Sequence, residues 1–183
     1  MEYIKSLYSV GNNKFNYHFY REDEKKSPIR LFEEDNIFKK INSYFLSEPT
    51  LIIDNIYLGN GNNAANINTL NKYNIDIVIN VTQELDNYFE DQFEYHKFEL
   101  LDEKKNNISN YFDRCLNIFQ NNKKKIFLIH CFMGSSRSAI MVLLYLTKIK
   151  NMTLEDSINF LKNKRDIVNI NVEFIEQLKN FLL

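Results

Sequence analysis

The sequence predicts an α/β domain in which a central, mostly parallel sheet is flanked by helices. Segments with strand character alternate with segments of helical spacing, which is typical of α/β architecture. Residues 75–81 are nearly continuous in β-branched side chains, as expected for a central strand covered on both faces. A second apolar run, 126–130, leads through a small polar loop into an apolar helix, so this loop should lie at the carboxyl end of a strand.

Length, charge and cysteine content limit the class of protein. The 183 residues suffice for one domain with a sizeable core, and the formal net charge of −1 predicts no bulk attraction to nucleic acid or to an anionic membrane. Two cysteines cannot form a disulfide framework, which favours a reducing compartment. No secretory h-region follows Met1, and no apolar run approaches the roughly 18 residues of a membrane span. We expect a soluble cytoplasmic protein, with the nucleus as the alternative.

Residues 1–48 are expected to form an N-terminal extension that is partly helical. Residues 1–10 are predicted as a short helix, and residues 11–28 are polar and charged. Apolar residues at helical spacing within 35–46 predict a second helix with one apolar face. Either this face packs on the domain's own surface, or the extension contacts a partner or a second subunit, the latter giving a homodimer.

The first half of the domain is predicted to contain most of the strands. Residues 51–53 and 56–59 flank Asp54-Asn55, which suits a hairpin turn. Residues 63–73 have helical spacing, and residues 93–100 form another strand candidate after the central strand.

The second half is predicted to be mostly helical. Thr153 and Asp156 have the spacing of a capping box, and Asn171 is placed to cap the last helix. The turn of Lys123, Lys124 and Lys125 should be exposed. The expected helices cover residues 108–120, 138–150, 153–165 and 172–183.

The strongest functional signal is the loop Cys-Phe-Met-Gly-Ser-Ser-Arg-Ser at residues 131–138. Converging backbone N–H groups and a helix start form an anion site, and both should stabilise the thiolate of Cys131. Arg137 can bind phosphate with two parallel hydrogen bonds. Gly134 is expected in a backbone conformation that a side chain would forbid. The alternative is a structural cysteine in a turn beside a surface arginine, with coincidental spacing.

The pattern His-Cys-x-x-Gly-x-Ser-Arg-Ser of residues 130–138 resembles the phosphate-binding loop of the protein tyrosine phosphatase superfamily. Its Ser-Arg-Ser ending resembles the dual-specificity phosphatases in particular. The resemblance runs from about Leu51 to the C-terminus. It implies a protein tyrosine phosphatase-like fold and a catalytic domain over residues 49–183. No cofactor is expected. No metal is expected either, because the three histidines show no ligand spacing with a cysteine.

The resemblance also implies a role for each residue of the loop. Cys131 attacks phosphorus and becomes a cysteinyl-phosphate, and Arg137 binds the phosphoryl oxygens as their charge develops. Ser138 resembles the family's hydroxyl that faces the sulfur and helps it leave. The phosphate-binding N–H groups are expected from Phe132, Met133, Gly134, Ser135 and Ser136.

Two further residues complete the expected site. Asp102 is the proposed general acid, because the family has an aspartate at this point with Ile-Ser six and seven residues later, as at Ile108-Ser109 here. Position alone leaves Glu99 and Glu103 as rivals. Strand alternation turns His130 away from the loop, so we interpret it as a hydrogen-bonding support that tunes the thiolate and not as the thiol's base.

The C-terminal part departs from the family pattern. Asp166 and Ile170 stand where prolines are usual, and Glu173 stands where glycine is usual. These departures affect the expected shape of the pocket rim and leave the residues of the chemistry in place.

The expected function is dephosphorylation of phosphotyrosine and of phosphoserine or phosphothreonine in protein substrates. The chain is short for a tyrosine-specific domain and lacks the Lys-Asn-Arg-Tyr element of a deep phosphotyrosine slot. The alternative is the same chemistry on a phosphoinositide, an RNA 5′-phosphate or a phosphoglycan, although the loop adds no charge to recognise such groups. A catalytically inactive phosphoprotein-binding module would be expected to lack one of three residues that this chain retains, Cys131, Arg137 and the acid.

Overall fold

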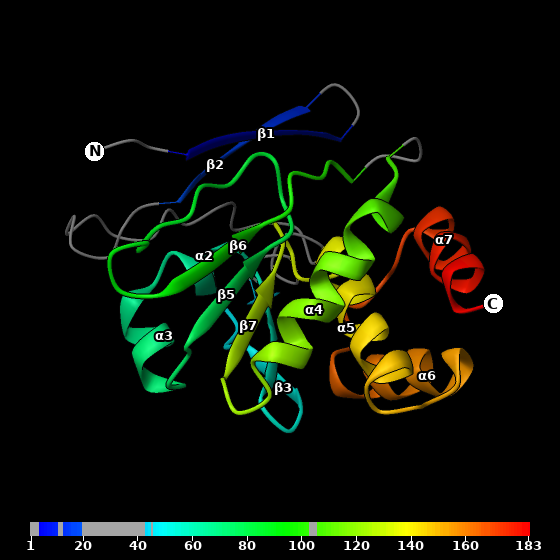
Figure 1. Ribbon diagram of the computed structural model, residues 1–183. Helices are drawn as coiled ribbons and strands as arrows, with labels where there is room; N and C mark the ends of the chain where they lie inside the picture. Colours follow the sequence, from blue (N-terminus) through cyan, green and yellow to red (C-terminus); the bar gives the residue numbers. More distant parts are fainter. Residues whose placement is uncertain (1–3, 11–12, 20–42, 45, 103–105) are drawn as a thin grey trace.

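A five-stranded sheet forms the centre of the computed structural model, which describes residues 4–10, 13–19, 43–44, 46–102 and 106–183 (Figure 1). Its strand order is β3-β4-β7-β5-β6, and every pairing is parallel except the β3–β4 hairpin. The predicted mostly parallel sheet is therefore confirmed. The strands are β3 (Thr50–Ile53), β4 (Ile56–Gly59), β5 (Ile77–Asn80), β6 (Glu94–Lys97) and β7 (Phe127–His130).

Helices cover both faces of the sheet, which explains the nearly unbroken apolar sequence of its central strands. All residues of β5 and β7 are buried. Val78 and Leu128 face one core beneath α2 (Gly61–Ala64) and α3 (Ile67–Lys72). The alternate residues Ile77, Ile79, Phe127 and Ile129 face a larger core beneath the remaining helices (Figure 1). Burial on both faces is typical of parallel strands.

The larger core is covered by α4 (Phe112–Asn121), α5 (Arg137–Lys148), α6 (Leu154–Lys164) and α7 (Val172–Leu182). Residues 137–147 of α5 are all buried, because α5 lies between the sheet and the other helices. The predicted caps are present: Thr153 Oγ1 accepts the N–H of Asp156 at 3.1 Å, and Asn171 Oδ1 accepts that of Glu173 at 3.1 Å.

Two predicted helices differ in detail. The helix expected over residues 63–73 is two helices, because Asn66 interrupts the pattern and caps α3 by accepting the N–H of Thr69 at 2.8 Å. Ser, Asn and Asp side chains compete with helical hydrogen bonds in this way. The helix expected over 108–120 begins as a 3₁₀ helix, η2 (Ile108–Tyr111), and continues as α4.

The helix predicted at residues 1–10 is wrong for the described part of that segment. Residues Ile4–Val10 form β1, which pairs antiparallel with β2 (Asn13–Phe19). The physical reason lies in the sequence: Gly11-Asn12 separates two runs, and residues 14–19 alternate between polar and aromatic side chains, which is a hairpin pattern. Most of the helix predicted at 35–46 lies outside the described residues.

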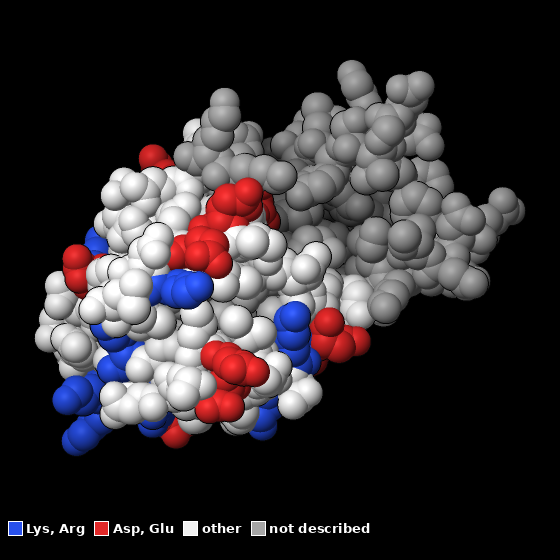
Figure 2. Space-filling view, turned by 90° about the vertical axis from the view of Figure 1, so that its right-hand side faces the viewer, with Lys and Arg blue, Asp and Glu red and all other residues white. Residues whose placement is uncertain are grey.

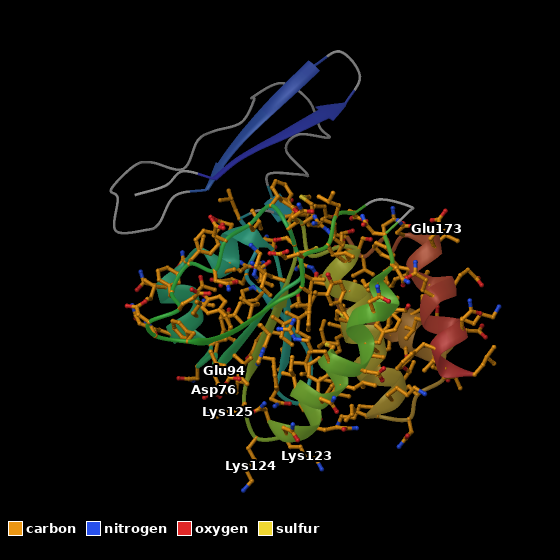
Figure 3. All side chains as sticks on the ribbon, turned by 45° about the horizontal axis from the view of Figure 1, so that its top comes forward. Asp76, Glu94, Lys123, Lys124, Lys125 and Glu173 are labelled. Carbon is orange, nitrogen blue, oxygen red and sulfur yellow. The ribbon has the colours of Figure 1, made fainter. Side chains whose placement is uncertain are left out.

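The surface features agree with the expected turn. Lys123, Lys124 and Lys125 are all exposed where α4 leads into β7, and Figure 3 shows Lys124 pointing away from the body of the domain. Lys125 pairs with Asp76 at 2.9 Å. Among the described helices, none has the length and apolar character needed to cross a bilayer.

Candidate active site

Hydrogen bonds to its carbonyl groups fix the conformation of the loop between β7 and α5. Each carbonyl of residues 131–136 accepts a hydrogen bond. The carbonyls of residues 132–135 bind other segments, whereas that of Cys131 binds the adjacent His130 side chain and that of Ser136 binds the N–H of Ile140 in α5. Because the C=O and the following N–H point in opposite directions across a planar trans peptide, these bonds turn the loop's N–H groups inward. The six donors, in chain order, are His130 Nδ1 (3.3 Å), Gly61 N (3.0 Å), Arg165 Nη2 (3.3 Å), Arg165 Nε (3.0 Å), Asn169 N (3.1 Å) and Ile140 N (3.0 Å).

Gly134 has the conformation that the sequence predicts. Its φ is +71°, in the left-handed region. A Cβ at this position would lie 2.3 Å from the carbonyl oxygen of Gly59, at the end of β4. Only glycine therefore permits the loop to approach β4 this closely.

The sulfur of Cys131 lies at the base of the loop. The residue is 2% exposed, and the sulfur accepts hydrogen bonds from Ser138 Oγ at 3.2 Å and from the N–H of Gly134 at 3.3 Å. Burial by itself raises the thiol pKa. The charge of Arg137 and hydrogen bonds from Ser138 and Ser135 outweigh burial, so the pKa of Cys131 lies below its ordinary value. The hydroxyl of Ser138 faces the sulfur as the family pattern implies.

Arg137 is fixed along one edge. Its Nη1 donates to Glu84 Oε2 at 2.8 Å and to the carbonyl of Leu100 at 3.0 Å, while Nη2 lies 2.7 Å from Glu84 Oε1. Its Nε is buried and has no hydrogen-bond partner within the described part of the chain. This unused donor is available to an anion in the loop. Burial lowers the pKa of Arg137, but the negative charges of Cys131 and Glu84 outweigh burial and raise it overall.

Asp102 is brought to the loop although it is distant in sequence. Its Oδ1 accepts a hydrogen bond from Ser136 Oγ at 3.1 Å, and its Oδ2 lies 3.8 Å from Arg137 Nε. The side chain is 30% exposed, so it faces both solvent and site. Glu99 is exposed, and its backbone carbonyl accepts a bond from Tyr111. Glu103, the other rival acid, lies outside the described residues.

His130 is a buried support for the loop. The ring is fully buried at the end of β7, and its Nδ1 lies 3.3 Å from the carbonyl oxygen of Cys131. Because a carbonyl only accepts, Nδ1 carries the proton. Burial is the main cause that lowers the pKa of His130 to about 4, with the charge of Arg137 acting in the same direction. The ring is therefore neutral at pH 7.

Two charged residues of the site, Arg165 and Glu84, were not predicted from the sequence. Arg165 is 5% exposed and donates to the carbonyls of Met133 and Gly134, and also to Thr50 Oγ1 at 3.1 Å. Burial lowers its pKa, partly offset by the negative charge of Cys131.

A weak signal pointed to Arg165. It continues the spacing of the buried residues Ser157 and Leu161 on α6, and a charge on a buried face needs partners. Glu84 had no such signal, because its partner Arg137 is 53 residues away in the sequence.

The remaining predicted residues of the loop differ in their exposure. Phe132 and Ser136 are buried, whereas Met133 and Ser135 are partly exposed. Ser135 Oγ donates to the carbonyl of Ile167 at 2.7 Å, which fixes the loop against the segment after α6. Figure 3 shows Glu173 at the start of α7. Among the described residues, no group of three or more histidine, cysteine, aspartate or glutamate side chains is placed to bind a metal ion.

A cysteine in a ring of backbone donors, with an arginine six residues later at a helix start, defines the class of cysteine-dependent phosphatases. Within that class the chain belongs to the dual specificity phosphatases. The family model described as "Dual specificity phosphatase, catalytic domain" matches residues 56–182.

The relatives are similar in sequence and in structure. Protein phosphatase Slingshot homolog 1 of Mus musculus and Homo sapiens is 36% identical over 139 residues, which cover 74% of this chain and 13% of that protein. This chain therefore spans a small part of the Slingshot relatives. Dual specificity protein phosphatase 1 of Arabidopsis thaliana is 33% identical over 153 residues, or 82% of this chain and 72% of that protein. The crystal structure of DUSP15 has a TM-score of 0.70 at 26% identity, covering 74% of this chain and 87% of that one.

Proposed function

We propose that this chain is a protein phosphatase that hydrolyses phosphotyrosine and phosphoserine or phosphothreonine through a cysteinyl-phosphate. One observation carries the proposal: the sulfur of Cys131 lies in a ring of hydrogen-bond donors beside a buried guanidinium with an unused N–H. Membership of the dual specificity phosphatases supports it. The substrates implied by that family are phosphorylated proteins.

In the first step, the thiolate of Cys131 attacks phosphorus and forms an S–P bond. The bond from phosphorus to the leaving oxygen breaks, and that oxygen takes the electron pair and a proton from protonated Asp102. Charge spreads over the equatorial oxygens of the phosphoryl group. The loop N–H groups and Arg137 Nε stabilise this charge without reorganising, because the outer bonds already fix them.

In the second step, water attacks the cysteinyl-phosphate. The carboxylate of Asp102 takes a proton from this water, the S–P bond breaks, and inorganic phosphate forms. The electron pair returns to sulfur. The Ser138 hydroxyl, 3.2 Å from the sulfur, stabilises the departing thiolate with the hydrogen bond that it already makes.

Several features favour a protein over the alternative substrates. The loop side chains at Phe132, Met133, Ser135 and Ser136 carry no charge, whereas recognition of multiply phosphorylated headgroups is served by added cations. A structural neighbour with a TM-score of 0.62, PTPMT1 in complex with PI(5)P, is only 20% identical and supports the fold alone. On the face seen in Figure 2, basic and acidic side chains are interspersed and form no continuous basic patch for nucleic acid.

The nucleophile can be tested against an internal control. Cys131→Ser should abolish turnover of an aryl phosphate, since serine's hydroxyl does not ionise in this site. Cys115→Ala is the matched control, because Cys115 is fully buried in the core and burial raises its pKa. Retained activity in Cys131→Ser would reject the mechanism. Activity against phosphopeptides, phosphoinositides and RNA 5′-phosphates, measured side by side, tests the substrate class.

We also propose that residues 49–183 are the catalytic unit and that the segment containing Tyr44 and Ser47 is held against this unit by hydrogen bonds. Asn60 Nδ2 donates to the carbonyl of Tyr44, and Asn63 Nδ2 donates to that of Ser47, both at 2.8 Å. The hydroxyl of Tyr44 also donates to Asp166 at 3.1 Å, beside the loop's supporting segment.

A further inference from the structure

The general acid is held through α7 as well as through the catalytic loop. Ser136 Oγ, which donates to Asp102, also accepts the N–H of Asn171 at 3.2 Å. Asn171 is the residue that caps α7. The start of α7 therefore meets the carboxylate of Asp102 through one shared hydroxyl.

A second contact lies further along α7. Gln177 Oε1 accepts the N–H groups of Ile108 at 2.8 Å and Ser109 at 3.2 Å, and its Nε2 donates to the carbonyl of Asn106 at 3.0 Å. One amide side chain thus binds three backbone groups where the chain leaves the acid segment and enters η2. The first N–H groups of a helix have no partner within the helix. Gln177 therefore supplies an acceptor for the N–H of Ile108 and a second acceptor for that of Ser109, which also donates to the capping Asn107 Oδ1 at 3.2 Å.

Asn106 extends the contact of Gln177 toward Asp102. Its side chain donates to the carbonyl of Leu101 at 2.9 Å, immediately before Asp102. A continuous path of hydrogen bonds therefore leads from Gln177 through the backbone and side chain of Asn106 to the residue next to the acid. Asn106, Gln177 and Asn180 line an open surface concavity of about 550 Å³ beside this path.

We propose that Gln177 is a positioning residue that sets the distance and orientation of Asp102 relative to the catalytic loop. This inference rests on the proposed function, because it requires Asp102 to act as the general acid. Gln177 does not touch the reacting atoms. Its effect reaches the reaction through the placement of a carboxyl group, and small displacements of catalytic groups are costly.

Leaving-group dependence separates positioning of the acid from general damage. Phenolate, the leaving group of phenyl phosphate, is a poor one and needs a proton from the acid. The 4-nitrophenolate of 4-nitrophenyl phosphate is a good leaving group and depends less on protonation. General acid catalysis contributes about 10²–10⁴-fold, so partial misplacement in Gln177→Leu should lower kcat/KM for phenyl phosphate about tenfold more than for 4-nitrophenyl phosphate.

Asn180→Leu is the matched control. Asn180 lies three residues along the same helix, is exposed, and lines the same concavity. The variant makes the same change from amide to leucine without removing the three backbone contacts of Gln177. Its ratio of the two kcat/KM values should stay within about twofold of the wild-type ratio.

A double-mutant cycle tests the route of the effect. If Gln177 acts through Asp102, adding Gln177→Leu to Asp102→Asn should cost less than about twofold further, since the acid is already lost. A full additional loss in the double variant, or an equal loss for both substrates in Gln177→Leu, would overturn the inference.

Gln177→Glu gives a second measurement if the leucine variant does not fold. It keeps an oxygen for Ile108 and Ser109 and loses the donor to Asn106. A smaller effect in the same direction supports the proposal, and a wild-type ratio overturns it. A failure of the proposed function can be distinguished from a failure of the inference on Gln177. If Asp102 is not the general acid, Asp102→Asn itself would show the same loss of kcat/KM for both substrates. Selectivity in Asp102→Asn without selectivity in either Gln177 variant would refute only the role of Gln177.

Discussion

Acidification should destabilise the fold through His130. The ring is fully buried, and its pKa is lowered to about 4 in the folded protein, against 6.5 for an unperturbed histidine. Between these values the unfolded chain binds a proton that the folded chain does not. The stability contributed by the neutral ring is thus complete above about pH 6.5 and falls as the pH drops toward 4.

The magnitude follows from the two pKa values. A difference of about 2.5 units corresponds to about 3 kcal/mol in full, and to about 2 kcal/mol at pH 5, where the folded ring is still largely neutral. This is a large share of the stability of a typical domain, which is roughly 5–15 kcal/mol.

His130→Asn isolates the effect, because asparagine retains an N–H donor for the carbonyl of Cys131 and does not titrate. Urea unfolding of both proteins at pH 7.5 and pH 5 gives four free energies of unfolding. The wild type should lose about 2 kcal/mol more than the variant between the two pH values. Equal losses in the two proteins would refute the reasoning, since they would show that the folded ring accepts a proton as easily as the unfolded one.

Three further predictions concern the loop and its supports. Gly134→Ala should lower aryl phosphate turnover at least about a hundredfold, because the added methyl displaces the loop; near-normal turnover would contradict the close approach to β4. Arg165→Met should raise the pKa of the Cys131 thiol, seen as a shift of the pH dependence of thiol alkylation to higher pH, and an unshifted profile would exclude electrostatic support from Arg165. Glu84→Gln should lower kcat/KM about tenfold, or about 1.4 kcal/mol, by freeing one edge of Arg137; unchanged steady-state kinetics would make that ion pair incidental.

Local patterns predicted the parts of this protein that local interactions determine. The β-branched run of β5 and the strand–loop–helix sequence around Cys131 each contain their own structural signal, and the structure has both. The same local reasoning failed at Asn66, where a side chain competes with the helix, and at residues 1–10, where a hairpin pattern was interpreted as a helix.

The supports of the site depend on contacts between distant segments. Glu84 meets Arg137 across 53 residues, and Gln177 meets Ile108 across 69. Sequence spacing says nothing about such pairs without a tertiary structure. The family pattern supplies long-range information that favours Asp102, and the structure brings its carboxylate to the loop; position alone leaves Glu99 and Glu103 as rivals.

The charges of the site explain why the outward carbonyl bonds matter. Arg137 and Arg165 contribute two positive charges, and Glu84 and the thiolate of Cys131 contribute two negative charges, so the site has no net positive charge when Asp102 is protonated. A phosphate dianion beside a thiolate therefore cannot be bound by net charge alone. Its stabilisation must come from oriented N–H dipoles and from the start of α5. Those dipoles face inward only while the carbonyls are held outward, so the residues that bind the carbonyls determine whether the loop can bind an anion.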